Sequence, residues 1–405
     1  MVSELIAALD IGTSKVVALV AEIDAVGQIN VIGFGEQPSM GLRKGMVVDI
    51  DATTNSVAAA VREAAAMANC KITNVYVGIA GAHIRSLNSS GMVAMKDSEV
   101  TEADMERVVE TAKAIAIPND QVVLHTLPQE YIIDGQEGVR RPLGMSGRRL
   151  EVKVHIVTGA VSAAENIEKC VRRCGLNVQE LVLQPLASAA ACLTSDEMEI
   201  GVGLIDIGGG TTDFALFTGG AIRHTGVIPV AGDQITNDIA MALRTPSKEA
   251  ADIKHRYACA LTKLVEPDEL IEVPSVADRP AKAMARHMLA EVVEPRVEEL
   301  FQLVHEQIKR SGFEPLLRSG IALTGGSSLL PGMAALGEEV FHMPVRLAAP
   351  DYRGALKDVL AAPKYATAIG LLMHGRDQQT RQAVLRRRDS AAAGMFAKLR
   401  DAFGV

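Results

Sequence analysis

The sequence predicts an α/β protein built from two duplicated domains, with a small α+β insert inside the first of them. Residues 9–15 (Leu-Asp-Ile-Gly-Thr-Ser-Lys) precede an apolar run, and so do residues 205–213 (Ile-Asp-Ile-Gly-Gly-Gly-Thr-Thr-Asp). Each pattern is typical of a strand, a tight turn of small residues and a second strand. Because the central aspartates, Asp10 and Asp206, lie about half a chain length apart, the sequence indicates an internal duplication.

A third glycine segment and the stretch between the two copies complete the predicted fold. Residues 321–328 (Ile-Ala-Leu-Thr-Gly-Gly-Ser-Ser) end a further predicted strand. Between a predicted strand at 75–80 and Gly159, residues 101–104 (Thr-Glu-Ala-Asp) resemble a capping box that starts a helix. Apolar and polar residues then alternate at 150–156, which is typical of a half-buried strand. A strand, a helix and further strands are enough for a small α+β insert.

The remainder of the chain is predicted to be helical, then flexible, then helical again. Residues 231–308 are mostly helical in pattern, whereas residues 376–394 contain almost no large apolar side chains and are typical of a flexible linker. On a helical wheel, the apolar side chains of residues 395–405 cover an arc of about 120° between flanking cations, which is typical of an amphipathic helix at a membrane surface. A terminal helix that docks on its own body is the alternative. The predicted membrane contacts are Met395, Phe396, Lys398, Leu399, Arg400 and Phe403.

Composition argues against several classes of protein. The net charge is −8, aromatic residues make up 3% and tryptophan is absent, so we expect no nucleic acid among the partners. Five cysteines in 405 residues are too sparse for a disulfide framework and fit a reducing compartment. We expect neither a secretory signal nor a membrane-spanning helix, because charged residues interrupt the apolar start and no apolar run is long enough. A basic tail on an acidic body indicates contact with an anionic surface such as a lipid membrane.

The two matched turns are suited to phosphate binding. Their backbone N–H groups can cradle phosphate oxygens, and glycine lets the backbone approach closely. The aspartate carboxylates can hold Mg²⁺, usually through water. Two such turns that face each other from two domains would grip the phosphate chain of a nucleotide from both sides. A single turn of this kind is most often an ordinary hairpin whose aspartate caps the turn, and the duplication is what favours phosphate chemistry.

The three segments resemble the phosphate-1, phosphate-2 and adenosine motifs of the superfamily of actin, the Hsp70 chaperones and the sugar kinases. Residues 183–190 and 364–371 resemble its two linking helices, so the resemblance spans residues 5–375. It implies a two-lobed actin-like fold of duplicated ribonuclease-H-like domains, with ATP and Mg²⁺ between the lobes. It also implies that Gln184 orients the hydrolytic water beside Asp206. Because a glutamine is a poor general base, we expect at most slow ATP hydrolysis.

The resemblance also implies a set of nucleotide contacts, in addition to Asp10 and Asp206 as ligands of Mg²⁺. At Lys254 the sequence departs from the superfamily pattern, because Ala251 stands where many members have a glutamate three residues earlier. The implied nucleotide contacts are Gly12, Thr13, Ser14, Lys15, Gly208, Gly209, Gly210, Thr211, Thr212, Lys254, Gly325, Gly326 and Ser327.

Within this superfamily, the detail resembles the FtsA family of bacterial cell-division proteins. That family places its extra subdomain where residues 85–159 fall. The resemblance implies polymerisation into filaments and tethering of the tubulin-like FtsZ to the cytoplasmic face of the inner membrane at the division site. It also implies recruitment of later division proteins, such as the cytoplasmic segment of FtsN, by the insert. The segments that carry the resemblance are residues 45–50, 77–81, 206–213, 226–232 and 294–296.

The resemblance assigns the FtsZ tail to the helical subdomain at 231–308. Asn237, Asp238 and Arg296 are the predicted contacts, because an acidic peptide requires a cation and hydrogen-bond donors. For Asn237 and Asp238, a helix-capping role is an equally good interpretation. The predicted boundaries are 1–84, 160–203 and 351–375 for the first lobe, 85–159 for the insert, 204–230, 231–308 and 309–350 for the second lobe, 376–394 for the linker and 395–405 for the membrane helix.

Two related functions compete with this interpretation. An actin-like adaptor of pilus assembly, resembling PilM, would share the nucleotide site but lack the linker and the terminal amphipathic helix. A small-molecule kinase of the same superfamily would need a catalytic aspartate beside a polar substrate pocket, and no such motif stands out. We therefore expect ATP binding to be mainly structural or regulatory.

Overall fold

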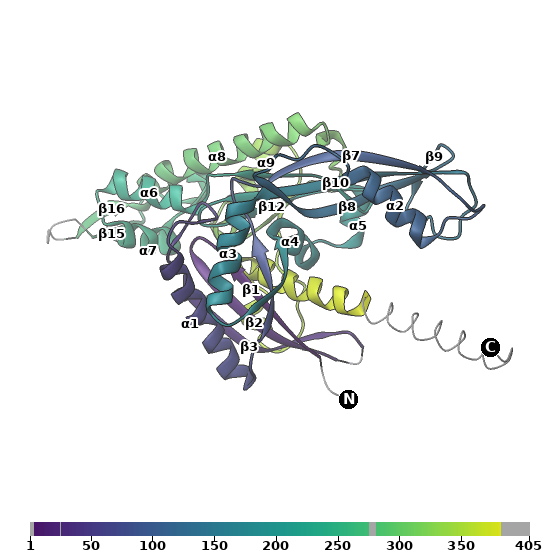
Figure 1. Cartoon of the computed structure of the whole chain (residues 1–405). Helices are drawn as coiled ribbons and strands as arrows, with labels where there is room; N and C mark the ends of the chain where they lie inside the picture. The colour runs from purple at the N-terminus through teal and green to yellow at the C-terminus, as the bar shows by residue number, and fades with distance from the viewer. Residues whose placement is uncertain (1–3, 25, 275–280, 382–405) are drawn as a thin grey trace.

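Two five-stranded sheets of the same design form the cores of two lobes (Figure 1). The computed structural model describes residues 4–24, 26–274 and 281–381. In spatial order, the first sheet contains β3 (Ile29–Pro38), β2 (Lys15–Ile23), β1 (Glu4–Ile11), β6 (Asn74–Ile79) and β11 (Asn177–Leu183). The second contains β14 (Ala221–Ile228), β13 (Thr212–Thr218), β12 (Val202–Ile207), β17 (Ile321–Thr324) and β18 (Val345–Leu347).

The two sheets also agree in strand direction. In each, the first three strands pair antiparallel and the last two join in parallel. Each lobe begins with the predicted hairpin, so the strand, tight turn and second strand occur at equivalent places in both sheets. The α/β class and the internal duplication that the sequence predicts are therefore confirmed.

Helices pack around these sheets, and local sequence determines where several of them begin. Asp49 starts α1 (Ile50–Ala68), because its carboxylate accepts the backbone N–H of Ala52 at 2.9 Å. Short helix α5 (Ser195–Ile200) packs on β13 of the second sheet, whereas α4 (Gln184–Cys192) and a helix at 366–381 lie against both sheets. Other helices of the first lobe are α3 (Val161–Arg173) and α10 (Lys357–Leu360). Those of the second lobe are α6 (Gly232–Leu243), α7 (Ser247–Tyr257), α8 (Arg286–Ser311) and α9 (Met333–Phe341).

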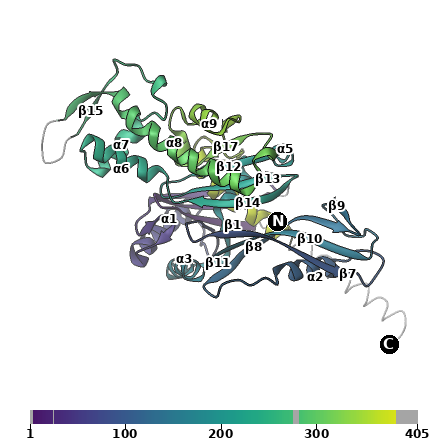
Figure 2. The same cartoon turned by 90° about the horizontal axis from the view of Figure 1, so that it is seen from above.

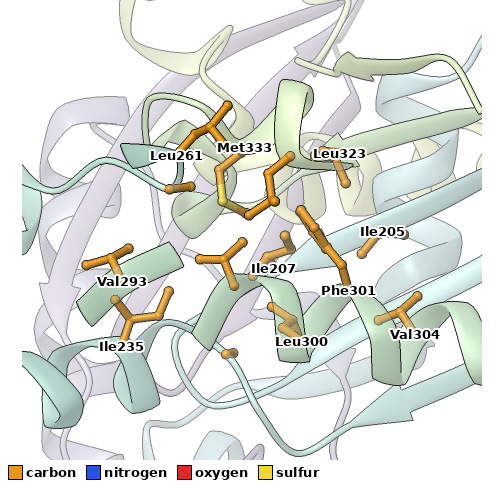
Figure 3. Packing of buried hydrophobic residues seen from close by; sticks show 14 of the residues in the cluster. Ile205, Ile207, Ile235, Leu261, Val293, Leu300, Phe301, Val304, Leu323 and Met333 are labelled. Atoms are coloured by element: carbon orange, nitrogen blue, oxygen red, sulfur yellow. The ribbon is translucent and has the colours of Figure 1, made fainter. Parts of the chain in front are cut away.

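The long helix α8 supplies one side of the second lobe's core. One apolar face of the helix is buried, and Figure 3 shows Leu300, Phe301 and Val304 of this helix beside Ile205 of β12 and Leu323 of β17. This packing removes large apolar side chains from water and thereby fixes the helix on the sheet.

Short elements complete both lobes. Two-stranded sheets are formed by β4 (Leu42–Arg43) with β5 (Met46–Val47), and by β15 (Leu270–Val273) with β16 (Lys282–Ala285). The second of these sheets lies inside the segment that the sequence predicts to be mostly helical. Single 3₁₀ turns occur at Thr262–Leu264, Glu314–Leu316, Gly326–Leu329 and Pro363–Tyr365.

A separate four-stranded sheet forms the insert, which extends to one side of the two lobes (Figure 2). In spatial order it contains β7 (Arg85–Ala94), β10 (Arg149–Ala160), β8 (Gln121–Ile133) and β9 (Gln136–Val139), and α2 (Glu102–Lys113) packs on it. The capping box is present, with Thr101 and Asp104 each accepting the other's backbone N–H. The small α+β insert is therefore confirmed.

Two helices lie between the sheets and join the lobes. Small side chains of α4 and of the helix at 366–381 share one buried cluster with residues of both sheets. They cross so closely that a Cβ atom on Gly370 would lie 1.8 Å from the carbonyl oxygen of Ala187. These are the two segments that resemble linking helices, and the crossing brings polar residues from both of them into the space between the lobes.

The C-terminal helix reaches beyond the boundary predicted for it. It continues through residues 376–381, which the sequence assigns to the flexible linker. The predicted membrane contacts, Met395 to Phe403, lie outside the described residues. Within the part of the chain that the structure describes, no helix is both long and apolar enough to cross a membrane.

Candidate nucleotide site

The two predicted turns have the same hydrogen-bonded geometry. In the first, the N–H of Gly12 donates to the carbonyl of Lys15 at 2.9 Å, and in the second, the N–H of Gly208 donates to the carbonyl of Thr211 at 3.0 Å. Each turn links the first two strands of its sheet, so the duplication extends from strand order to individual hydrogen bonds.

These turns face each other directly across the lobes. A Cβ atom added to Gly209 would lie 1.8 Å from Ser14 Oγ, and one added to Gly210 would lie 2.6 Å from Thr13 Oγ1. Only glycine allows the backbones to approach this closely. Gly325 has the left-handed φ of +86°, and a Cβ there would lie 2.4 Å from Asp206 Oδ1, so this third segment also needs glycine.

A cavity of about 660 Å³ lies where the three segments meet. Its size is within the range of about 300–1,000 Å³ that is usual for small-molecule sites. All the predicted nucleotide and metal contacts line it except Thr212, as does Gln184. The Thr212 side chain is instead buried and its hydroxyl donates to the Val230 carbonyl at 2.8 Å, which links the start of β13 to the segment that follows β14.

Of the two duplicated aspartates, Asp10 is buried and Asp206 is half-buried, and both accept hydrogen bonds. Asp10 Oδ1 accepts from Gln184 Nε2 at 3.1 Å, and Asp206 Oδ2 accepts from Ser188 Oγ at 2.6 Å. Thr367 contributes a longer contact of 3.4 Å to the same oxygen of Asp206. Burial raises the pKa of Asp10 to about 6, and the charge of Asp206 adds to this shift against the opposing attraction of Lys15. Burial likewise raises the pKa of Asp206.

A third carboxylate, Asp213, completes this acidic side of the cavity. Its Oδ2 accepts from Thr211 Oγ1 at 2.8 Å, whereas its Oδ1 is buried without a hydrogen-bond partner. Burial raises the pKa of Asp213 to about 7, with a further contribution from Asp206. A buried carboxylate oxygen without a partner is rare in folded proteins and favours an additional polar or cationic group at this place.

The donor set fits Mg²⁺ held together with a nucleotide. Among the described residues, no group of three or more histidine, cysteine or acidic side chains is arranged to hold a metal ion by itself. Mg²⁺ keeps several waters and usually binds through one or two carboxylates plus phosphate oxygens. Asp10, Asp206 and Asp213 around a cavity with room for phosphates match that requirement.

Lys15 supplies positive charge on the same side. Its Nζ donates to the carbonyl of Lys364 and lies 4.5 Å from the ring centroid of Tyr365. Burial lowers the pKa of Lys15, while the nearby charges of Asp10 and Glu36 oppose that shift. A desolvated ammonium next to a phosphate-sized space is suited to bind an anion.

The third segment and α7 form the other end of the cavity. Ser327 Oγ donates to the carbonyl of Gly208 at 2.8 Å, and Lys254 Nζ donates to the carbonyl of Gly232 at 2.9 Å. His255 follows Lys254 on α7 and also lines the cavity. Leu329, Leu330 and Pro331 provide an apolar wall there.

Sequence reasoning missed several residues of this site. Asp213 lies at the end of the second predicted segment, and Lys364 and Thr367 lie in the second segment that resembles a linking helix, so both patterns contained a signal. No pattern in the sequence pointed to Glu36 or His255 as residues of the site. The cavity residues that sequence reasoning did not select are Glu36, Asp213, His255, Leu329, Leu330, Pro331, Pro363, Lys364 and Thr367.

The predicted peptide-binding residues lie together on α6 and α8. Arg296 donates through Nη2 to Asp238 Oδ1 at 3.2 Å, and it also pairs with Glu299. Asn237 is exposed, with its amide 3.5 Å from the sulfur of Met241. Because Asn237 and Asp238 lie inside α6, which begins at Gly232, the helix-capping interpretation is wrong.

The fold and this cleft define a two-lobed actin-like protein. The PilM-PilN type IV pilus biogenesis complex has a TM-score of 0.65 at 17% identity, covering 92% of this chain and 98% of that one. MreB5 of Spiroplasma citri bound to ADP has a TM-score of 0.55 at 16% identity, covering 94% and 98%. At these identities the likeness establishes the fold alone.

Sequence relatives establish the family. Residues 203–370 match the family "Cell division protein FtsA", and residues 81–158 match the "SHS2 domain inserted in FTSA". Cell division protein FtsA of Pseudomonas aeruginosa is 61% identical over 377 residues, covering 93% of this chain and 90% of that protein. Its counterpart in Escherichia coli is 45% identical over 403 residues, covering 98% and 96%. The chain belongs to the FtsA family of cell division proteins.

Proposed function

We propose that this chain is an ATP-binding, polymerising adaptor that tethers FtsZ filaments to the cytoplasmic membrane and recruits later division proteins. One observation supports the proposal most strongly. Two duplicated turns, one from each lobe, face each other with Asp10 and Asp206 beside a cavity of about 660 Å³. The names of the sequence relatives support the cell-division context, and they favour this function over a pilus adaptor or a small-molecule kinase.

ATP with Mg²⁺ is the ligand that we propose for the cleft. Solved MreB5 structures of the same fold are described as bound to ADP and to AMPPNP. In this chain, the turn N–H groups and Lys15 would bind the phosphates, and Asp10, Asp206 and Asp213 would face the cation. Mg²⁺ would supply charge neutralisation between the phosphates and these carboxylates.

Gln184 is the residue that we propose to orient the water for ATP hydrolysis. Its amide already donates to Asp10 at 3.1 Å, which fixes the side chain at the edge of the cleft. An amide can orient a water molecule but cannot take its proton, so slow hydrolysis is expected. The bound nucleotide would then act mainly on lobe closure and assembly.

Self-association would strengthen attachment to the membrane. MamK, with a TM-score of 0.50 to this chain, is described as a double helical filament. A single short amphipathic segment such as 395–405 binds a bilayer weakly, whereas many of them on one filament bind by avidity. Filament formation and localisation at the cytoplasmic face of the inner membrane are therefore proposed as linked properties.

Asp206→Ala tests the nucleotide site. We expect the variant to lose at least about tenfold in ATP affinity in the presence of Mg²⁺, because a charge-bearing ligand and its hydrogen bonds disappear. Asp196→Ala, at an exposed position on α5, is the control and should bind as the wild type does. Equal affinities of wild type and Asp206→Ala in equilibrium titrations would contradict the site.

Electron microscopy on anionic lipid monolayers tests assembly. We expect ATP-dependent filaments on the lipid, and we expect a peptide of the FtsZ tail to bind them. If filaments form equally with and without ATP, or if the Asp206→Ala protein assembles as the wild type does, the link between nucleotide and polymer is wrong.

A further inference from the structure

The insert contacts the first lobe at a buried backbone amide. Leu183 is the last residue of β11, which is an edge strand of the first sheet, and its N–H donates to Nε2 of His125 at 2.9 Å. His125 belongs to β8 of the insert, and both residues are buried. A buried N–H on an edge strand needs a partner from outside its own sheet. A histidine of the insert provides it here.

This amide lies one residue before the proposed water-orienting side chain. Leu183 is the residue from which α4 starts, and no side chain caps the start of that helix. Gln184 follows as its first residue, and its amide donates to Asp10 in the cleft at 3.1 Å. On its other side, Gln184 lies over Gly78, where an added Cβ would come within 3.1 Å of Gln184 Cγ.

We propose that His125 of the insert is a positioning residue that holds Gln184 beside Asp10 in the nucleotide cleft. The proposal rests on the function proposed above, because it assigns His125 an effect on the hydrolysis of ATP. Through this contact, a displacement of the insert relative to the first lobe changes the start of α4 and with it the placement of Gln184.

The surroundings of His125 allow one orientation and one protonation state for this role. Because Nε2 accepts from Leu183, the ring is neutral and its proton is on Nδ1, which lies 4.0 Å from Glu180 Oε1. Glu180 is paired in turn with His374 of the helix at 366–381, at 2.8 Å. Burial lowers the pKa of His125 to about 4, with His374 adding to the shift against Glu180.

A second buried histidine connects the insert to the other lobe. His155 of β10 lies 3.0 Å through Nε2 from Thr225 Oγ1 of β14, and 2.7 Å through Nδ1 from Asn88 Oδ1. Ser86 Oγ also donates to the Thr225 carbonyl at 3.0 Å. The insert is therefore held to both lobes at once. His155 is a matched control, because it is also buried but makes its hydrogen bonds to Asn88 and Thr225 rather than to the start of α4.

Hydrogen exchange of the full-length protein tests the contact itself. Pro185 has no amide proton, so a peptide covering 181–186 reports on few amides, including that of Leu183. We expect His125→Leu to speed exchange of this peptide about tenfold, since the amide loses its acceptor, and His125→Gln to restore protection. His155→Leu should leave this peptide unchanged. The proposal is overturned if His125→Leu has no effect there, or if His155→Leu has the same effect.

Single-turnover hydrolysis tests whether the contact acts through Gln184. After ATP affinity is measured separately, we expect His125→Leu to slow hydrolysis of bound ATP several-fold, roughly as much as Gln184→Ala does, and His125→Gln to recover most of the rate. The double variant should be no slower than Gln184→Ala alone. If the two substitutions slowed hydrolysis independently, so that the loss of rate in the double variant were the product of the two single losses, the proposal would be overturned. If the wild type bound no ATP, the proposed function would fail, while the exchange comparison would still decide the role of the His125 contact.

Discussion

Gly209 of the second lobe and Ser14 of the first meet so closely that a Cβ atom on Gly209 would lie 1.8 Å from Ser14 Oγ. The two turns therefore touch, and the space for phosphates lies beside this contact. Any side chain at position 209 must push the lobes apart or displace Ser14. One added carbon atom at this contact is therefore enough to change the distance between the lobes.

The first prediction concerns this contact. Gly209→Ala should lower the free energy of unfolding by about 1–3 kcal/mol through overpacking, and it should weaken ATP binding because the turns are forced apart. Adding Ser14→Gly removes the obstructing hydroxyl and should recover stability relative to Gly209→Ala. Thermal melting and ATP titration of the single and double variants check this. Additive losses in the double variant would show that the two turns do not touch in solution.

The second prediction concerns pH. Burial raises the pKa values of Asp10 and Asp213 to about 6 and about 7, from an ordinary value of 3.8. From pH 3.8 up to about 6 for Asp10, and up to about 7 for Asp213, the folded protein keeps a proton that the unfolded chain has lost. Each of these carboxyl groups therefore lowers the free energy of unfolding as the pH rises through its window. A tenfold difference in proton affinity between the folded and the unfolded chain corresponds to about 1.4 kcal/mol.

The measurement for this prediction is a difference between two proteins. Burial lowers the pKa values of His125 and His155 from 6.5 to about 4. Between these pH values the unfolded chain binds protons that the folded protein does not, so the two histidines raise stability as the pH rises and oppose the carboxyl groups. We therefore expect nucleotide-free Asp213→Asn to gain stability relative to the wild type as the pH rises from 4 to 7. Asp196→Asn is the exposed control. Parallel stability curves for wild type and Asp213→Asn would refute the burial effect.

The third prediction concerns the peptide surface on α6 and α8. Arg296 is already paired with Asp238 and Glu299, so an acidic tail must compete with these carboxylates. Arg296→Ala should weaken binding of an FtsZ tail peptide about tenfold or more, whereas Asp238→Asn should strengthen it by freeing the guanidinium. Fluorescence anisotropy with a labelled peptide measures both. Arg310→Ala, in an ion pair with Glu306 on the same helix, is the matched control. If Arg310→Ala weakens binding equally, the effect is one of general charge.

The fourth prediction concerns the C-terminal segment. Changing Phe396 and Phe403 to glutamate should abolish co-sedimentation with vesicles that contain anionic lipid, because the apolar arc becomes charged. Asp401→Asn changes the opposite side of the predicted helix and should retain binding. Deletion of 395–405 should match the double glutamate variant. Unaltered pelleting of the truncated protein would instead favour a terminal helix that docks on its own body.

Much of the fold could be predicted from neighbouring residues alone. Tight turns after Asp10 and Asp206 need small residues, and the capping box at Thr101 needs a particular spacing, so these features are visible in the sequence. The alternation of apolar and polar residues at 150–156 indicates a strand, and this pattern too is formed by neighbouring residues. A hairpin at β15 and β16 was missed, because its short strands carry no clear alternation within a segment that otherwise has a helical pattern.

Two glycine-rich turns that follow two equivalent strands can be predicted from sequence, because backbone geometry depends on residues close together in the chain. Which side chains share the cleft depends on the packing of segments that are far apart in the chain. Ser188 and Thr367 reach Asp206 because two helices of small residues cross between the sheets, and His125 reaches Leu183 because the insert covers a sheet edge. Burial then raises the pKa of Asp206 and lowers that of His125, and this burial depends on the packing of distant segments.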